Sequence, residues 1–146
     1  MLYDKLLKET EARVFEVDMP STIKGLYADN VIWINKSIPT STEKACILAE
    51  ENGHYHTSIG NILDQSSIPN RKQEQRARTW AYRKLIPLSS FVQAHKQGIH
   101  NRYELAEYLE VTESFLEDSL KRYQEIYGTH TQWKCFTIYF DPLLIL

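Results

Sequence analysis

The hydrophobic pattern of this chain changes its period at Pro39, and this change restricts the fold more than any other feature. Before Pro39, apolar and polar residues alternate over Arg13–Met19, which is the two-residue period of a half-buried strand. Short strand patterns also cover residues 23–28 and 31–35, and Asp29-Asn30 between them is a turn of hairpin type. The N-terminal part of the chain therefore predicts a small antiparallel sheet.

After Pro39 the pattern is helical. Thr40 and Glu43 form a capping box, which opens a first central helix that runs toward His54. A loop-like stretch rich in Ser, Asn and Pro follows from Thr57 to Pro69. Asn70 with Gln73 is a second cap, for a second central helix that reaches Leu85. The other predicted elements are helices at 3–10, 88–97, 101–109 and 112–127 and a strand at 131–140.

The composition indicates one α+β domain. With 146 residues, 42% of them hydrophobic, the chain buries enough surface for one core, so we expect a single domain over residues 1–146. Its longest apolar runs have about five residues, far fewer than a membrane span needs, and its start lacks a signal-peptide pattern, so we expect a cytoplasmic protein. A net charge of −2 gives no overall attraction to nucleic acid. Cys46 and Cys135, which lack CxxC spacing, are predicted to be reduced, buried thiols.

The segment from Ala49 to His56 carries the most unusual chemistry. Glu50 and His54 are i and i+4 on a helix, so they project from one face and can share a metal ion. Glu51 lies about 100° around the helix. This offset lets a carboxylate act on a metal-bound water, as in the HExxH motif. The first histidine of that motif is a glutamate here, and Glu–His pairs with this spacing also occur on ordinary solvated helix faces.

The second central helix offers a further carboxylate. Glu74 heads a stripe that continues through Ala77, Ala81 and Leu85, so it lies on the face expected to turn inward. A buried carboxylate needs a partner. A metal held between this glutamate and the first helix supplies one, with the three protein ligands typical of catalytic zinc. The alternative is that Glu74 caps its helix or pairs with a nearby arginine, Arg71 or Arg78.

The same residues carry a family resemblance. In order and spacing, the chain resembles the ImmA/IrrE family of metallopeptidases, notably its phage and prophage members, over Lys24–Asn35, Cys46–Tyr55 and Glu74–Ala81. The resemblance extends over about residues 23–87. It implies a zincin-like fold, with the small sheet packed on the two central helices and additional C-terminal helices. It also implies a cytosolic protease that cleaves a helix-turn-helix repressor and so releases the genes that this repressor silences.

The resemblance implies roles for individual residues. His54 is a metal ligand, Glu51 is the base that activates the metal-bound water, and Glu74 is the downstream acidic ligand. Glu50 departs from the family's HExxH pattern, since a carboxylate stands in place of the first histidine. Two carboxylates formally neutralise a divalent ion, which makes its bound water less acidic and shifts the metal preference toward manganese or iron. We therefore predict zinc held by Glu50, His54 and Glu74, with manganese or iron as alternative metals.

Three neighbouring residues leave alternatives open. If the helix ends near His54, His56 can supply the missing imidazole, and Glu50 then orients a ligand without touching the metal. Cys46 lies on the same stripe but about 12 Å along the axis from His54, so we expect it in the core. Tyr55 either packs or donates a hydrogen bond to a developing oxyanion.

The strand predicted at residues 31–35 comes shortly before the first central helix. In zincin-like proteins an equivalent edge strand holds an extended substrate through backbone pairing. These residues are therefore a candidate substrate site, and the alternative is an ordinary inner strand.

Two other functions stay open at this point. One is a protein that keeps the peptidase fold and binds its repressor, or another regulator, without cleaving it; Glu50 keeps this alternative open. The other is a helix-turn-helix DNA-binding module formed by Tyr103–Leu109 and Glu113–Tyr123. Three basic residues against seven acidic ones between Asn101 and Tyr127 disfavour DNA binding, because such a surface repels phosphate. We expect a protein partner and no direct nucleic acid binding.

Overall fold

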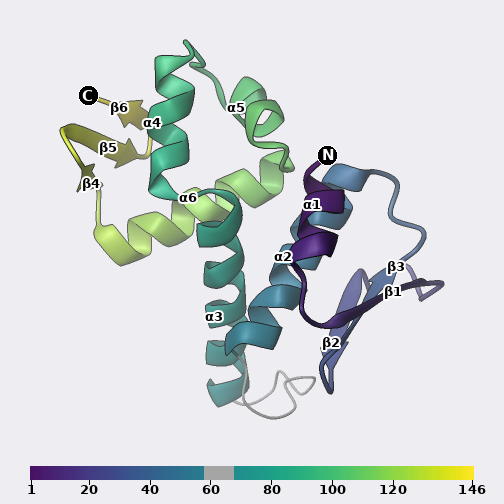
Figure 1. The fold of residues 1–146 in the computed structure, drawn as a ribbon. Coiled ribbons are helices and arrows are strands. Elements are labelled where there is room, and N and C mark those ends of the chain that lie inside the picture. Colours follow the sequence, from purple (N-terminus) through teal and green to yellow (C-terminus); the bar gives the residue numbers. More distant parts are fainter. Residues whose placement is uncertain (58–67) are drawn as a thin grey trace. The chain divides into compact units, whose positions relative to one another are not determined.

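A computed structural model of the chain describes residues 1–57 and 68–146, with the backbone alone at 68–70 (Figure 1). The described residues form two compact units, Met1–Ala81 and Tyr82–Leu146, and each is considered by itself below. The fold is mixed α+β, as predicted. The single-domain organisation expected from chain length remains a prediction. None of the helices within the described ranges is long and apolar enough to cross a membrane.

The first unit contains a three-stranded sheet and the helices that pack on it. Its elements are α1 (Leu2–Glu9), β1 (Arg13–Val17), β2 (Gly25–Ala28), β3 (Val31–Asn35), α2 (Ser41–Thr57) and most of α3 (Ile68–Leu85). Thr40 caps α2 as predicted, since its Oγ1 accepts a hydrogen bond from the backbone N–H of Glu43 at 3.1 Å. Most of the predicted loop from Thr57 to Pro69 lies outside the described residues, but α2 includes Thr57 and α3 already begins at Ile68. Asn70 therefore lies inside α3, and the prediction that it caps this helix is wrong.

The sheet is mixed rather than antiparallel, with the strand order β1-β3-β2. The predicted hairpin joins β2 to β3, and its turn residues Asp29 and Asn30 have φ values of 50° and 64°. β1, however, lies parallel to β3. The connection from β1 to β2 allows this arrangement, because the side-chain amide of Asn35 donates to the carbonyl oxygens of Met19, Pro20 and Ile23.

One face of this sheet forms the core of the first unit. Ile32 and Ile34 are fully buried, and α2 contacts β2 and β3 through its own buried residues (Ala45, Cys46, Ile47, Leu48, Ala49). Cys46 is therefore a core residue, as predicted. Glu16 ties α1, β1 and α2 together, since it accepts hydrogen bonds from the Tyr3 hydroxyl at 3.0 Å and from the Lys44 ammonium at 2.7 Å.

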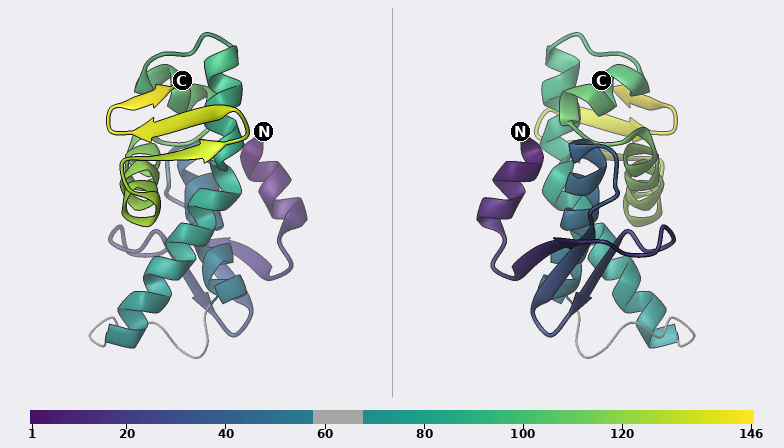
Figure 2. Two further views of the ribbon diagram at one scale, coloured as in Figure 1. Left: turned by 90° about the vertical axis from the view of Figure 1, so that its left-hand side faces the viewer. Right: turned by 90° about the vertical axis from the view of Figure 1, so that its right-hand side faces the viewer.

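The second unit consists of three helices followed by three strands. They are α4 (Leu88–Lys96), α5 (Arg102–Leu109), α6 (Glu113–Tyr127), β4 (His130–Trp133), β5 (Phe136–Phe140) and β6 (Leu143–Ile145). Thr112 caps α6 by accepting a hydrogen bond from the N–H of Phe115 at 3.1 Å. The strands form one small antiparallel sheet, drawn in yellow in Figure 2.

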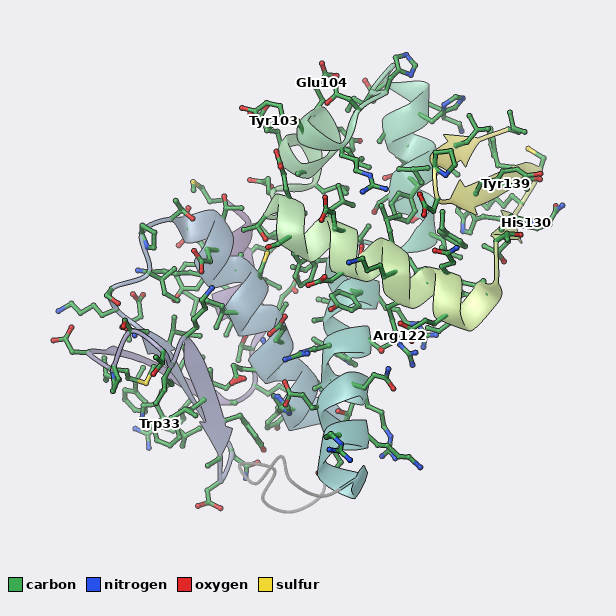
Figure 3. All side chains as sticks on the ribbon, turned by 180° about the vertical axis from the view of Figure 1, so that it is seen from behind. Trp33, Tyr103, Glu104, Arg122, His130 and Tyr139 are labelled. Atoms are coloured by element: carbon green, nitrogen blue, oxygen red, sulfur yellow. The ribbon has the colours of Figure 1, made fainter. Side chains whose placement is uncertain are left out.

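The single strand predicted at 131–140 is in fact the hairpin β4–β5. Lys134, with a φ of 53°, and Cys135 form its short turn, and His130 stacks beside Tyr139 across it, with ring centroids 5.1 Å apart (Figure 3). Because Cys135 lies in this turn it is exposed, and the prediction of two buried thiols is wrong for this residue.

Candidate metal centre

The crossing of α2 and α3 is set by two small residues, Gly53 and Ala77. A Cβ atom added at Gly53 would lie 2.1 Å from the carbonyl oxygen of Ala77, so only glycine allows this approach. Ala77 and Ala81 are fully buried, which confirms the predicted inward stripe of the second helix. This close contact brings the side chains that flank Gly53 and Ala77 on the two helices within reach of one another.

His54 and Glu74 meet beside this crossing. The distance from His54 Nε2 to Glu74 Oε2 is 3.0 Å, while 5% of the His54 side chain and 20% of the Glu74 side chain are exposed. Glu74 Oε1 lies 3.4 Å from Arg78 Nε. Glu74 therefore pairs with one of the two arginines named above as alternative partners, and it also contacts His54. The i, i+4 arginine screens one carboxylate oxygen, and the other faces the imidazole.

Glu51 is the third ionisable group at this place. Its Oε1 lies 3.8 Å from His54 Nε2, and its Oε2 is buried without a hydrogen-bond partner among the described residues. Burial raises the pKa of Glu51 to about 7; the His54 imidazole opposes this rise, and the carboxylates of Glu50 and Glu74 add to it. A carboxyl group with such a pKa can take up and release a proton near neutral pH.

The remaining predicted ligand is Glu50. It is partly exposed, and it acts on Glu51 as a nearby like charge. Within residues 1–57 and 68–146, no three His, Cys, Asp or Glu side chains are grouped closely enough to hold a metal ion. The structure thus brings Glu51, His54 and Glu74 together, and the assignment of Glu50 as a ligand stays a prediction.

The donor types at this place fit a divalent cation. An imidazole nitrogen faces one carboxylate directly and a second at slightly longer range, and the second has a buried oxygen with no partner among the described residues. Nitrogen and carboxylate donors of this kind suit zinc, manganese and iron. A cation held by His54 and Glu74 would lie close to the buried Glu51 carboxyl group, and its positive charge would offset part of the cost of burying that group.

The alternative metal ligand His56 was predicted only for the case that α2 ends near His54. In the structure α2 continues to Thr57, whose hydroxyl donates to the carbonyl oxygen of Gly53 at 2.7 Å. His56 is exposed and stacks on Trp80, with ring centroids 4.7 Å apart and planes 18° apart. Tyr55 donates its hydroxyl hydrogen to Glu11 Oε2 at 3.1 Å, which favours the packing role over the oxyanion role.

The candidate substrate strand at residues 31–35 is the central strand β3, so its assignment as an edge strand is wrong. The strand beside α2 that has an open edge among the described residues is β2. A Cβ atom at Gly25 of β2 would lie 2.7 Å from Ile47 Cγ2 and 3.3 Å from Glu51 Cγ. β2 was not predicted from the sequence as the open edge, although an isolated glycine within a strand pattern is itself a signal of close approach.

One comparison with known proteins finds a family match for this chain. Residues 7–121 match the model of a peptidase family described as the IrrE N-terminal-like domain. The match covers most of the chain and includes α2, the described part of the crossing helix α3, and β2. No curated protein and no solved structure matches the chain.

Proposed function

The chain belongs to the IrrE N-terminal-like family of metallopeptidase-type domains, and from this premise we propose that it is a zinc-dependent endopeptidase. The observation that carries the proposal is the 3.0 Å contact between His54 Nε2 and Glu74 Oε2, next to the buried carboxyl group of Glu51. Two consecutive helices, α2 and α3, bring together there the residue types that a catalytic zinc site uses.

In this proposal His54 and Glu74 hold the metal, and Glu50 completes the ligand set. A bound zinc ion supplies Lewis acidity, which polarises the peptide carbonyl and lowers the pKa of water. With two carboxylates in the set, manganese or iron are the alternative metals.

Glu51 is the proposed general base. Its Oε2 has no hydrogen-bond partner among the described residues, so this atom is available to accept a proton from water as the water attacks the peptide bond. The group that takes the proton must later give it to the leaving amine, and burial, which raises the pKa of Glu51, favours its protonated form for that second step. His54 Nε2 lies 3.8 Å from Glu51 Oε1 and 3.0 Å from Glu74 Oε2, so the proposed base lies beside a proposed metal ligand.

The substrate is proposed to bind as an extended strand along the open edge of β2. Backbone pairing there holds a peptide without regard to its sequence, and it brings the peptide past Gly25 to Glu51. Gly25 matters because any side chain there would meet Ile47.

The proposed substrate is a helix-turn-helix repressor of a phage or mobile element in the cytoplasm, which rests on the family resemblance. Direct DNA binding by α5 and α6 is not part of the proposal. The first turns of α6 expose Glu113, Glu117 and Asp118, which would repel phosphate.

The second candidate function is binding of a regulator without cleavage. The observation in its favour is that Glu50 stands where the HExxH pattern has histidine, and that the described residues contain no ready group of three ligands. Such a protein would form a stable complex with the repressor and leave it intact.

The test uses the purified protein with the repressor encoded beside its gene. The wild type should produce defined fragments, and Glu51→Gln should slow cleavage by about a thousandfold, which is within the range of a lost general base. Metal content should be unchanged in this variant. A stable complex without fragments would favour the second function, and loss of metal in Glu51→Gln would contradict the role assigned to Glu51.

A further inference from the structure

We propose that the outer face of the sheet in the first unit is a docking site for one helix of the protein substrate, separate from the cleavage site. The outer face is the side of β1, β3 and β2 that points away from α2. The inference rests on the proposed function, because it concerns how the repressor is held while a segment of it lies along β2. It adds a second contact to a cleavage site that binds mainly peptide backbone.

The strand register places apolar side chains side by side on this face. Phe15 of β1 pairs with Trp33 of β3, and Trp33 pairs in turn with Leu26 of β2. Trp33 alternates with Ile32 and Ile34, which are fully buried, so it points to the opposite side of the sheet from them. Figure 3 labels Trp33 on the side of the sheet away from α2. The next row of the outer face contains Arg13, Val31 and Ala28.

These two rows lack a covering layer among the described residues. The Phe15 side of the row is open, since this residue is 41% exposed, and Trp33 and Leu26 are partly exposed. α2 contacts β2 and β3, but it covers the other face of the sheet. Parallel strands such as β1 and β3 are usually covered by helices on both faces. A helix is therefore the element that would complete this part of the sheet.

The size of the outer face fits one helix. Strands lie about 4.8 Å apart and rise about 3.3 Å per residue, so three short strands cover roughly 15 Å by 15 Å. An α-helix is about 10 Å wide, and about ten of its residues span that length. A stable dimer buries about 800 Å² on each partner, several times the area of this face. The face is thus too small to hold a second copy of the chain by itself, and a transient helix contact suits it better.

Arg13 indicates the charge of the docked helix. Its guanidinium carbon lies 5.3 Å from the centre of the Phe15 ring, and no carboxylate of the described residues forms an ion pair with it. A helix with an apolar stripe and a carboxylate beside it would cover the aromatic rings and pair with Arg13.

The outer face is continuous with the proposed cleavage site. Leu26 belongs to β2, the strand whose open edge takes the peptide in the proposed function. A helix on the outer face therefore lies next to the paired segment, and a connection of about two to six residues would join the two. The substrate expected from this arrangement is a helical protein with an extended segment close to an acidic, amphipathic helix.

The test compares two substrates of the same enzyme. Wild type, Phe15→Thr and Trp33→Thr are assayed with the intact repressor encoded beside the gene and with a short peptide that contains only its cleavage site. Threonine keeps the strand propensity but removes the ring, and thermal unfolding checks that each variant is folded. KM for the intact repressor should rise about tenfold in each variant, as expected for a lost aromatic contact in an interface, and KM for the peptide should not change.

Matched variants test the location and the charge of the docking site. Tyr103→Thr is the aromatic control, since Tyr103 is 61% exposed in the second unit, and it should leave both KM values unchanged. Arg13→Glu should raise KM for the intact repressor about threefold, the range of a partly exposed ion pair, whereas Lys8→Glu, at an exposed base of α1, should not. No change with the repressor in folded Phe15→Thr and Trp33→Thr proteins, or an equal rise with both substrates, would overturn the inference.

Binding in the Glu51→Gln background separates this inference from the proposed function. Fluorescence anisotropy of the labelled repressor measures its affinity there, with and without Trp33→Thr. Binding that weakens about tenfold with Trp33→Thr, while the wild type cleaves neither substrate, keeps the docking face and overturns the endopeptidase. Cleavage of both substrates with KM values insensitive to Trp33→Thr keeps the endopeptidase and overturns the docking face. A wild-type dimer in sedimentation that Trp33→Thr dissociates would also overturn it, because a second copy would then occupy the face.

Discussion

The two units of the chain differ in what they bury. Among the described residues, the first unit buries Asn35, Glu51, Asn52, His54 and Thr79 together with its apolar core. Among its described residues, the second unit buries the hydroxyl of Ser119, which donates to the carbonyl oxygen of Leu116, and the hydroxyl of Tyr123, which donates to the carbonyl oxygen of Ile86, but it buries no carboxylate, imidazole or amide side chain. Burying an ionisable pair costs stability unless it is matched, so this cost is concentrated in the unit that carries the candidate metal centre. The comparison indicates that buried ionisable side chains are a property of the first unit among the described residues.

The largest difference in stability between the two units is expected for a change at the crossing of α2 and α3. Gly53→Ala places a methyl group against the Ala77 backbone, and we expect it to lower the free energy of unfolding by about 3 kcal/mol and to weaken metal binding. Ser119→Ala in the second unit should cost about 1 kcal/mol, because it removes one local hydrogen bond. Urea denaturation of both variants checks the difference, and equal costs would contradict it.

A smaller effect is expected at Asn52. Its side-chain amide donates to Thr10 Oγ1 at 2.9 Å and so links α2 to the end of α1. Asn52→Ala should lower the free energy of unfolding by about 2 kcal/mol, since it removes a buried link between two helices. Denaturation measures this cost, and hydrogen exchange should show faster opening of α1. A cost below that of Ser119→Ala would argue against a special role for buried polar groups in the first unit.

The helix caps are expected to contribute equally to the stability of the two units. Thr40 and Thr112 each accept a hydrogen bond at 3.1 Å from the third residue after them, at the starts of α2 and α6. Thr40→Ala and Thr112→Ala should therefore each cost about 1 kcal/mol, as measured by thermal unfolding. If only the first costs stability, the difference between the units extends beyond buried groups.

The smallest predicted effect is on the stability of the fold at acid pH. The hydrogen bond from Lys44 lowers the pKa of Glu16 below its ordinary value of 4.5, and burial opposes this only in part. A lowered pKa stabilises the fold above the ordinary value, and this stability is lost as the pH falls through the lowered value. Lys44→Met should reduce this acid dependence, since it removes the largest cause of the lowered pKa and leaves the hydrogen bond from Tyr3, at a cost below about 1 kcal/mol at neutral pH. Unfolding curves at pH 7 and at acid pH check it; an unchanged acid slope would contradict it.

Local signals predicted most of the helices. The caps at Thr40 and Thr112 act within one turn of the chain, so their effects are visible in sequence. The same holds for the Asp29-Asn30 turn, because a two-residue hairpin needs positive φ at both positions.

Features that depend on distant contacts were not predicted. No local turn relates β1 to β3, so nothing in the strand patterns indicated their parallel pairing or the central place of β3. The turn at Lys134 and Cys135 contains no Gly, Asn or Asp, and the pattern there read as one strand. At the candidate site, the inward stripe of α3 predicted that Glu74 faces the first central helix, and its 3.0 Å contact with His54 agrees with that prediction. The Gly53–Ala77 crossing that allows this contact was not predicted, because it lies outside sequence periodicity.

Metal content tests the central claim most directly. The account holds that His54 and Glu74 grip one cation from two helices, so mass spectrometry of the native wild-type protein should find about one divalent metal ion per chain. His54→Ala and Glu74→Ala should each lose most of it, while Glu113→Ala, which changes an exposed acid of the second unit, should retain it. A wild type that binds no divalent metal, or full occupancy in both His54→Ala and Glu74→Ala, would contradict the account.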